Sequence, residues 1–118
     1  MSQSLKILKA LTDATRLRLV ALLSREELSV NELQEITELG QSRISTHLGV
    51  LQENDLLTFR KDGKRSLYRI NPKTSHQARE CLELARQIAS EGDEHEQDGR
   101  NLKRVLEQRS EQAQVYFN

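Results

Sequence analysis

The spacing of apolar residues changes near Leu56, and this change constrains the fold of the chain more than any other feature. Over residues 41–54 the apolar side chains recur at helical spacing, whereas from Leu56 onward they alternate with polar residues. The Asp62-Gly63 pair interrupts this alternation and supplies a two-residue turn of the kind that needs positive φ. The sequence therefore predicts a β-hairpin directly after a helix.

The tip of the predicted hairpin is basic. Its four cations, which we expect to be too many to be neutralised locally, are Arg60, Lys61, Lys64 and Arg65. Contacts with nucleic-acid phosphates would explain such a cluster, and a solvated turn is the alternative. On the first strand, Leu57 and Phe59 form the apolar side. We expect the return strand to carry Ser66, Tyr68 and Ile70 on the face opposite Leu57 and Phe59.

Four helices are predicted before the hairpin, over about residues 4–12, 14–25, 29–37 and 41–54. Asp13 is the predicted N-cap of the second helix, and Ser29 with Glu32 forms a capping box at the start of the third. Residues 38–40 leave room only for a tight turn. We therefore expect a mostly α fold with a small β-hairpin, in which residues 1–72 form a winged helix-turn-helix that binds DNA.

The outer face of the predicted helix 41–54 carries short polar side chains and one long cation. In a helix-turn-helix this helix enters the major groove, where base edges present a distinctive pattern of donors and acceptors. We expect DNA contacts here from Gln41, Ser42, Arg43, Ser45, Thr46 and His47. Arg43 is the candidate for a guanine contact, and His47 is expected near the core-side edge, packed or close to a phosphate. An ordinary solvated helix surface is the alternative.

Residues 73–118 are predicted to form C-terminal helices for dimerisation or linkage, one over about 73–90 and one after the acidic stretch 91–99. Apolar residues recur at heptad-like spacing in the last helix. Together with two leucines of the first helix they exceed what a winged core can bury, so we expect a homodimer. The predicted interface residues are Leu5, Leu8, Leu102, Leu106, Ala113 and Tyr116.

Charge is unevenly distributed along the chain, although 18 basic and 18 acidic residues leave no net charge. Residues 41–73 carry seven Lys/Arg against three Asp/Glu (+4), and residues 74–118 carry six against nine (−3). A DNA-facing middle and a partner-facing tail would have this distribution, and chance clustering explains it equally well. Arg16 and Arg18 are candidates for phosphate contacts or for ion pairs with Asp13 or a neighbouring glutamate.

Enzyme motifs are absent from the sequence, which has no Gly-rich phosphate loop, nucleophile–base pattern or paired carboxylates. We therefore expect neither catalysis nor a cofactor. Asp93-x-His95 has the spacing of half a metal site, but the region that would supply the other half holds Leu106 and Arg109, so no metal is expected. The single cysteine, Cys81, cannot form an internal disulfide. No apolar run reaches membrane-spanning length, and we expect a cytoplasmic protein with no membrane partner.

Several segments resemble ArsR-type repressors. Residues 11–19 (LTDATRLRL) resemble the family's opening motif, residues 27–33 (ELSVNEL) its next helix entry and residues 41–48 (QSRISTHL) its recognition helix. Residues 51–57 (LQENDLL) and the hairpin ending in residues 68–70 (YRI) are similar to the entry and exit of its wing. The resemblance covers residues 5–70 and implies a dimeric repressor that releases its double-stranded DNA operator when an effector binds.

Two departures from the family pattern matter. Glu38 stands where the family usually has a turn glycine, so a residue that disfavours positive φ must accommodate the turn. Ser29 and Asn31 stand where metal-sensing members have a Cys-x-Cys pair, and without thiolates the soft-metal site is missing. We therefore expect a small-molecule effector that is not a metal. A metal or arsenic sensor and a protein-interaction module that does not bind DNA are the alternatives.

Residues 105–118 resemble the helix that leads into a fused methyltransferase domain in one branch of ArsR-type proteins. This resemblance implies either the N-terminal part of a longer protein or a stand-alone relative that senses a methyl-cycle metabolite such as S-adenosylhomocysteine. An amphipathic dimerisation helix explains the same residues.

Overall fold

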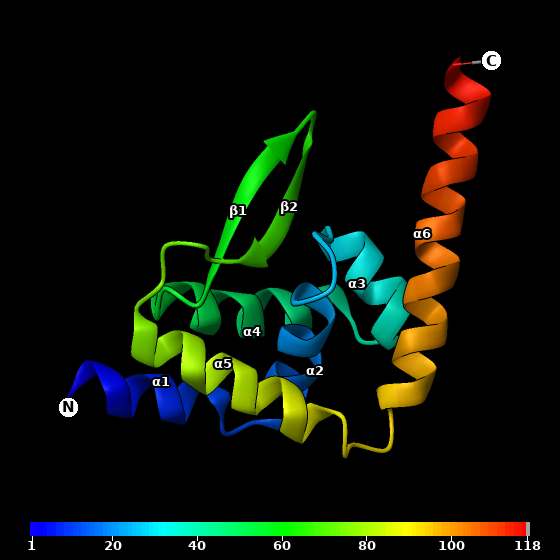
Figure 1. Ribbon diagram of the computed structural model, residues 1–118. Coiled ribbons are helices and arrows are strands. Elements are labelled where there is room, and N and C mark those ends of the chain that lie inside the picture. The colour runs from blue at the N-terminus through cyan, green and yellow to red at the C-terminus, as the bar shows by residue number, and fades with distance from the viewer. Residues whose placement is uncertain (118) are drawn as a thin grey trace.

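Six helices and one antiparallel hairpin make up the part of the chain that the computed structural model describes, residues 1–117, with side chains described as far as Val115 (Figure 1). In chain order the elements are α1 (Gln3–Leu11), α2 (Ala14–Leu23), α3 (Val30–Thr37), α4 (Gln41–Glu53), β1 (Leu57–Asp62), β2 (Arg65–Ile70), α5 (His76–Ala89) and α6 (His95–Phe117). The mostly α fold with a small hairpin is confirmed. No helix within the described residues is both long and apolar enough to cross a membrane.

Side chains cap the helices at the predicted positions. The Asp13 carboxylate accepts a hydrogen bond from the backbone N–H of Arg16 at 3.0 Å, which starts α2. At the start of α3, the Ser29 hydroxyl accepts from the backbone of Glu32 at 3.2 Å, and the Glu32 carboxylate accepts from the backbone of Ser29 at 2.9 Å. This reciprocal pair is the predicted capping box, and it satisfies two backbone N–H groups that the first turn leaves free.

Two residues with left-handed backbone follow the helices of the helix-turn-helix, one at the end of α3 and one just after α4. Glu38 closes α3 with φ 62° and donates its backbone N–H to the backbone carbonyl of Gln34, so the left-handed position of this turn is held by a residue other than glycine. Asp55, between α4 and β1, has φ 58°, a position that the sequence did not single out. Aspartate is among the residues that adopt this region more readily than most, whereas glutamate has no such preference and glycine is favoured there.

Phe59 and Tyr68 lie on the same face of the hairpin. They are register partners, and their ring centroids are 5.5 Å apart. Directly opposed residues of antiparallel strands share a face, so the expectation that Tyr68 faces away from Phe59 is wrong. The same holds for Ile70, which pairs with Leu57, and for Ser66, which pairs with Lys61 on that face.

The hairpin loop lies one residue later than expected. Asp62 pairs with Arg65, so the two loop residues are Gly63 and Lys64 rather than Asp62 and Gly63. Gly63 has φ 64°, whereas Lys64 is not among the residues with positive φ. A glycine at the first loop position followed by a residue with ordinary φ is the pattern of a type II′ turn, whose twist matches that of the strands.

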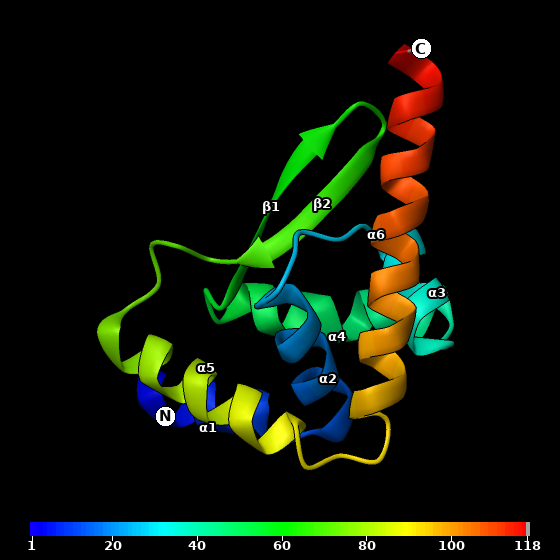
Figure 2. The same ribbon diagram turned by 45° about the vertical axis from the view of Figure 1, so that its right-hand side comes forward.

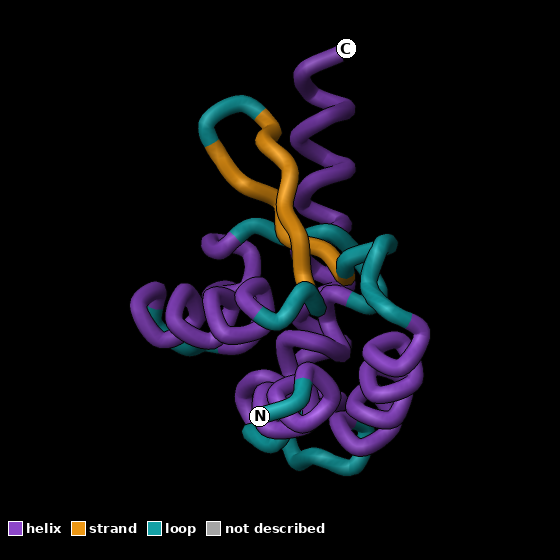
Figure 3. The backbone as a smooth tube through the Cα atoms, turned by 90° about the vertical axis from the view of Figure 1, so that its left-hand side faces the viewer, coloured by secondary structure: helices purple, strands orange, loops and turns teal. Residues whose placement is uncertain are grey.

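The hairpin projects from one side of the helical body (Figure 3). A short bridge anchors its base, because Leu28 and Tyr68 exchange backbone hydrogen bonds of 3.1 and 2.9 Å. Leu19, Leu33 and Ile44, from α2, α3 and α4, are fully buried in the core, and the strands of the hairpin contact these three helices. These contacts fix the hairpin relative to α4, which is what a winged helix-turn-helix requires.

The last helix, α6, packs along α3 and continues beside the hairpin (Figures 1 and 2). Leu102 and Val105 are 1% and 4% exposed and belong to the main core. The Asn101 side chain donates a hydrogen bond of 2.8 Å to the backbone carbonyl of Ile36. Contacts within the chain therefore account for the burial of Leu102, which we had expected at a dimer interface.

Candidate nucleic-acid interface

The outer face of α4 consists of short, uncharged polar side chains. Ile44, Leu48 and Leu51 bury the inner face of this helix. The exposed face holds Gln41, Ser42, Ser45 and Thr46, all predicted contact residues. The Thr46 hydroxyl donates to the backbone carbonyl of Ser42 at 2.9 Å, which holds it close to the helix. Such a face presents donors and acceptors with little bulk, so a second surface can approach it closely.

Arg43 and His47 lie on the flank of α4 that faces α2. The Arg43 guanidinium donates to the hydroxyl of buried Thr15 at 3.1 Å. The His47 ring lies 3.0 Å from the Arg16 guanidinium and 3.9 Å from the Asp13 carboxylate. These two predicted residues therefore sit at the edge of the exposed face rather than at its centre.

The two arginines of the hairpin are paired with acids, two of which precede or begin α3 while the third lies on the hairpin itself. Arg60 donates to the Glu27 carboxylate at 3.1 and 3.2 Å, and this partner raises its pKa. Arg65 lies 3.3 Å from the carboxylate of Asp62 and 3.8 Å from that of Glu32. The expectation that the four cations cannot be neutralised locally is thus wrong for both arginines: Asp62 of the same hairpin lies beside Arg65, and folding brings Glu27 and Glu32 to the hairpin.

Lys61 and Lys64 differ from the two arginines. Both are exposed, and neither has an acid within ion-pair distance in the described part of the chain. Their ammonium groups are therefore free for an external anion. In sequence order the four cations look equivalent, and only the fold separates these two lysines from the paired arginines.

Arg18 is a structural residue rather than a surface cation. Its guanidinium donates to both oxygens of Asp98 on α6, at 2.8 and 2.9 Å, and to the backbone carbonyl of Thr37 at 3.1 Å. The hydrogen bond to Asp98 raises the pKa of Arg18 against the opposing effect of burial. The candidate phosphate contact is wrong for Arg18, whose acid lies far away in sequence. Arg16 donates to the backbone carbonyl of Ala10 and contacts His47.

A second candidate surface is apolar and lies between α1 and α5. Leu5 and Leu8 on α1 are 49% and 51% exposed, and Leu84 and Ile88 on α5 are 54% and 44% exposed. A hollow of about 460 Å³ between the two helices is lined by Leu8, Leu84 and Ile88, with Cys81 beside them. Exposed apolar side chains gathered on one face indicate an association surface.

Sequence reasoning identified only half of this apolar surface. It placed Leu5 and Leu8 there but missed Leu84 and Ile88, whose spacing of four residues on α5 was the available signal. Among the other predicted interface residues, Leu106 is partly buried against the core and Ala113 is exposed on the distal part of α6. The side chain of Tyr116 lies outside the described residues.

Candidate metal ligands do not converge in the described part of the chain, where no three His, Cys, Asp or Glu side chains lie close enough to hold an ion. Ser29 and Asn31 stand at the start of α3, where the sequence comparison with metal sensors placed them. Ser29 is used in the capping box. Insensitivity to metal stays a prediction.

Comparisons with known proteins agree with this geometry. The sequence profile of the bacterial regulatory protein arsR family matches residues 13–58. The transcriptional activator HlyU of Vibrio cholerae is 31% identical over 87 residues, covering 74% of this chain and 78% of that protein. The arsenical resistance operon repressor of Staphylococcus aureus is 42% identical over 65 residues, 55% of this chain, and the match spans 62% of the repressor's length.

A solved structure shows the same likeness. The homodimeric winged helix-turn-helix DNA-binding domain of Mb0332 from Mycobacterium bovis, a possible ArsR-family regulator, is 28% identical with a TM-score of 0.63, covering 79% of this chain and 83% of that fragment. The resemblance of residues 105–118 to a helix that leads into a methyltransferase domain stays a prediction.

Proposed function

The chain belongs to the ArsR family of bacterial regulatory proteins, and from this premise we propose that it is a dimeric transcriptional repressor that binds operator DNA through α4 and the hairpin. One observation carries the proposal: the exposed polar face of α4 lies on the same molecule as a rigidly anchored hairpin with free lysines. A helix of this kind reads base edges, and cations beside it hold the phosphate backbone.

Within this proposal the residues of α4 have different roles. The centre of its exposed face, with Ser45 and Thr46, approaches the floor of the major groove. Arg43 reaches a base from the edge of that face, because Thr15 engages only one of its five N–H donors. A guanine presents the two acceptors that suit this guanidinium. His47, at the same edge, lies where a phosphate would pass.

Two chains are needed to read a symmetric operator. We place the dimer contact on the apolar surface formed by Leu5, Leu8, Leu84 and Ile88. A two-fold axis there makes the contact self-complementary, and it presents two copies of α4 on one side of the dimer. The half-sites would then lie about one helical turn, or 10 base pairs, apart.

Release of the operator is assigned to an effector other than a metal. Soft-metal sensing needs thiolates, and the first turn of α3 carries Ser29 and Asn31 at the corresponding positions. Related proteins include both repressors and an activator. Repression is the role favoured here, because a dimer bound across a promoter blocks polymerase without needing a further contact surface. The cytoplasm is the compartment where such a regulator acts.

The proposal is tested by selecting duplexes from a random library on the purified protein and measuring affinity by fluorescence anisotropy. We expect a two-fold symmetric sequence to be enriched. The Ser45→Glu variant, which places a carboxylate on the exposed face of α4, should lower its affinity by about a hundredfold or more through repulsion. Ser110→Glu, an equivalent change on exposed α6, is the matched control and should bind normally. Failure to enrich any duplex, or normal binding by Ser45→Glu, would contradict the proposal.

A further inference from the structure

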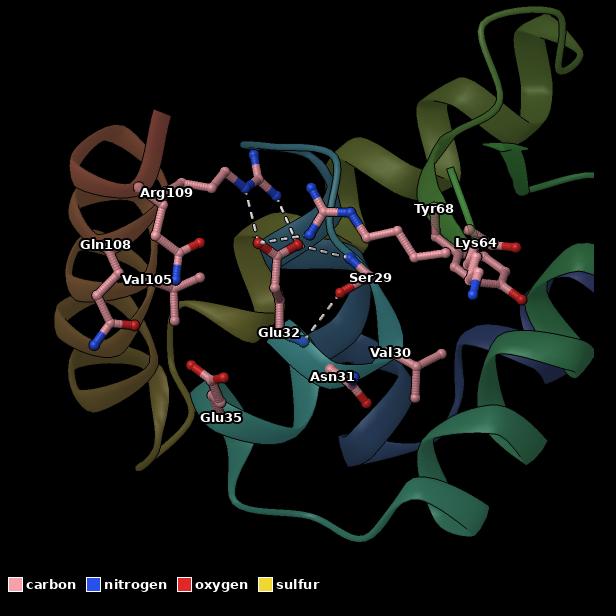
Figure 4. Close-up of a pocket in the computed structure, with 13 residues that line it drawn as sticks. Ser29, Val30, Asn31, Glu32, Glu35, Lys64, Tyr68, Val105, Gln108 and Arg109 are labelled. Atoms are coloured by element: carbon pink, nitrogen blue, oxygen red, sulfur yellow. Dashed lines mark hydrogen bonds and ion pairs between the residues drawn. The ribbon is translucent and has the colours of Figure 1, made fainter. Parts of the chain in front are cut away.

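A polar cavity of about 590 Å³ opens between the start of α3, the start of β2 and the middle of α6 (Figure 4). This volume is in the range of sites that hold small metabolites. Its lining residues come from three separate elements, and the cavity exists only because α6 packs along α3 beside the hairpin. The lining includes four charged residues, Glu32, Lys64, Arg65 and Arg109, and four uncharged polar ones, Asn31, Tyr68, Gln108 and Gln112.

One buried carboxylate and two arginines form the charged centre of this cavity. The Glu32 carboxylate accepts hydrogen bonds from the Arg109 guanidinium at 2.7 and 2.8 Å (Figure 4). Arg65 approaches the same carboxylate to 3.8 Å. Burial raises the pKa of Glu32, but the hydrogen bonds from Arg109 and from the backbone of Ser29 together lower it by more than burial raises it. The net shift of the pKa is therefore downward. Glu32 is therefore ionised at neutral pH and balances one of the two guanidinium charges.

Positive charge remains in the cavity after this pairing. Lys64 adds an ammonium group that has no acid within ion-pair distance in the described residues. The Arg65 guanidinium lies 3.3 Å from the Asp62 carboxylate and 3.8 Å from the Glu32 carboxylate, and it makes a short two-point contact with neither. Glu35, the other acid of the lining, is exposed. Guanidinium and ammonium groups whose charge is incompletely matched favour an anion with carboxylate or phosphate oxygens.

Neutral polar groups surround the charged centre. Asn31, Gln108 and Gln112 offer amide donors and acceptors, and Tyr68 adds an aromatic ring. Neither the Gln108 nor the Gln112 side chain takes part in a hydrogen bond within the described residues, so both side-chain amides are free for a ligand. Such a lining suits the polar body of an organic anion better than a bare inorganic ion.

We propose that this cavity binds a small organic anion, held through its carboxylate or phosphate group by Lys64 and Arg65, beside the ion pair of Arg109 with Glu32. Lys64 and Arg65 are also the hairpin cations that face DNA phosphates in the proposed function. One cation cannot neutralise both at once, so occupancy of the cavity and phosphate contact by the hairpin oppose each other. The effect on DNA rests on the proposed function, whereas binding of the anion does not.

Anion binding is measured directly on the free protein, by titrating ¹⁵N-labelled full chain with citrate and, separately, with pyrophosphate at an ionic strength held constant with sodium chloride. We expect saturable amide shifts at Asn31, Lys64 and Arg109 with at least one probe. The two probes distinguish a carboxylate ligand from a phosphate ligand. Absence of saturable shifts with both probes would overturn the proposal.

A matched pair of variants separates the cavity from general charge effects. Gln108→Glu places a carboxylate in the cavity without breaking a hydrogen bond and should weaken binding of the better probe at least fivefold. Gln114→Glu adds the same charge to α6 at an exposed position outside the lining and should leave binding unchanged. Equal affinity of the two variants for the probe would also overturn the proposal.

The link to DNA is measured separately with the selected duplex. At matched ionic strength the better probe should lower DNA affinity at least threefold in the unaltered protein and less in Gln108→Glu. If the probe binds and DNA affinity does not change, the coupling is wrong while the anion site stands. If no duplex is bound at all, the proposed function fails, and the titration of the free protein still shows whether the cavity binds an anion.

Discussion

The two free lysines of the hairpin should set much of the salt dependence of DNA binding. Neither Lys61 nor Lys64 has to break an ion pair within the described residues before it contacts a phosphate, so each displaces a counterion from DNA. A dimer presents both lysines twice. At about 0.9 per phosphate contact, Lys61→Ala with Lys64→Ala should reduce the slope of log affinity against log salt by about 3.6. Between about 50 and 200 mM salt, the unaltered protein should lose about 150 times more affinity than the double variant.

The paired arginines should behave differently in the same assay. Arg60 must exchange its contact with Glu27 for one with a phosphate, so Arg60→Ala should flatten the slope less than either lysine change. Lys103→Ala removes an exposed cation from α6 and serves as the control with an unchanged slope. Anisotropy titrations at four or more salt concentrations provide the slopes. An unchanged slope in the double lysine variant, or an equal effect of Arg60→Ala, would refute this reasoning.

Other predictions concern stability, assembly and effectors. Asp98→Ala leaves Arg18 partly buried without its acid and should lower the free energy of unfolding by about 2–3 kcal/mol in urea titrations. The loss is smaller than for a fully buried ion pair because the Arg18 side chain is 17% exposed. An unchanged urea midpoint would show that this ion pair does not hold α6 in place. Leu84→Glu with Ile88→Glu should give a monomer by sedimentation at micromolar concentration, and a retained dimer would place the interface elsewhere. The pKa of Glu32 is lower in the folded chain than its ordinary 4.5, so its stabilising contribution is present above that pH and is lost as the pH falls through the folded value. The unfolding free energy of Glu32→Gln should therefore change less between about pH 5 and 3 than that of the unaltered protein, and parallel profiles would contradict this. Zinc, cadmium and arsenite at low micromolar concentration should leave the operator complex intact, and release by any of them would contradict the absence of a thiolate site.

Local features of this fold could be predicted from the sequence because they depend on neighbours in the chain. The Ser29–Glu32 capping box joins residues three apart, and the buried stripe of α4 follows from helical spacing. The hairpin was predicted from alternation and a glycine, although its loop was misplaced by one residue and its faces were misassigned. Turn type depends on the φ of each loop residue, which composition does not determine.

Contacts between distant segments could not be predicted in this way. Arg18 meets Asp98, and Arg60 meets Glu27, only after the chain has folded. Leucine spacing in the last helix indicated an apolar stripe but could not show that Leu102 is buried in the core of the same chain. The spacing of apolar residues identifies which face of a helix is buried, but the segment that packs against that face is known only from the folded structure.

The proposed reading of one duplex by two copies of α4 is tested most directly by changing the spacing between half-sites. With the selected operator, inserting about five base pairs at its centre rotates one half-site to the opposite side of the helix. Affinity measured by anisotropy should then fall to that of a single half-site, and inserting about ten base pairs should restore part of it. Equal affinity for the original and the half-turn duplex would contradict dimeric reading by α4.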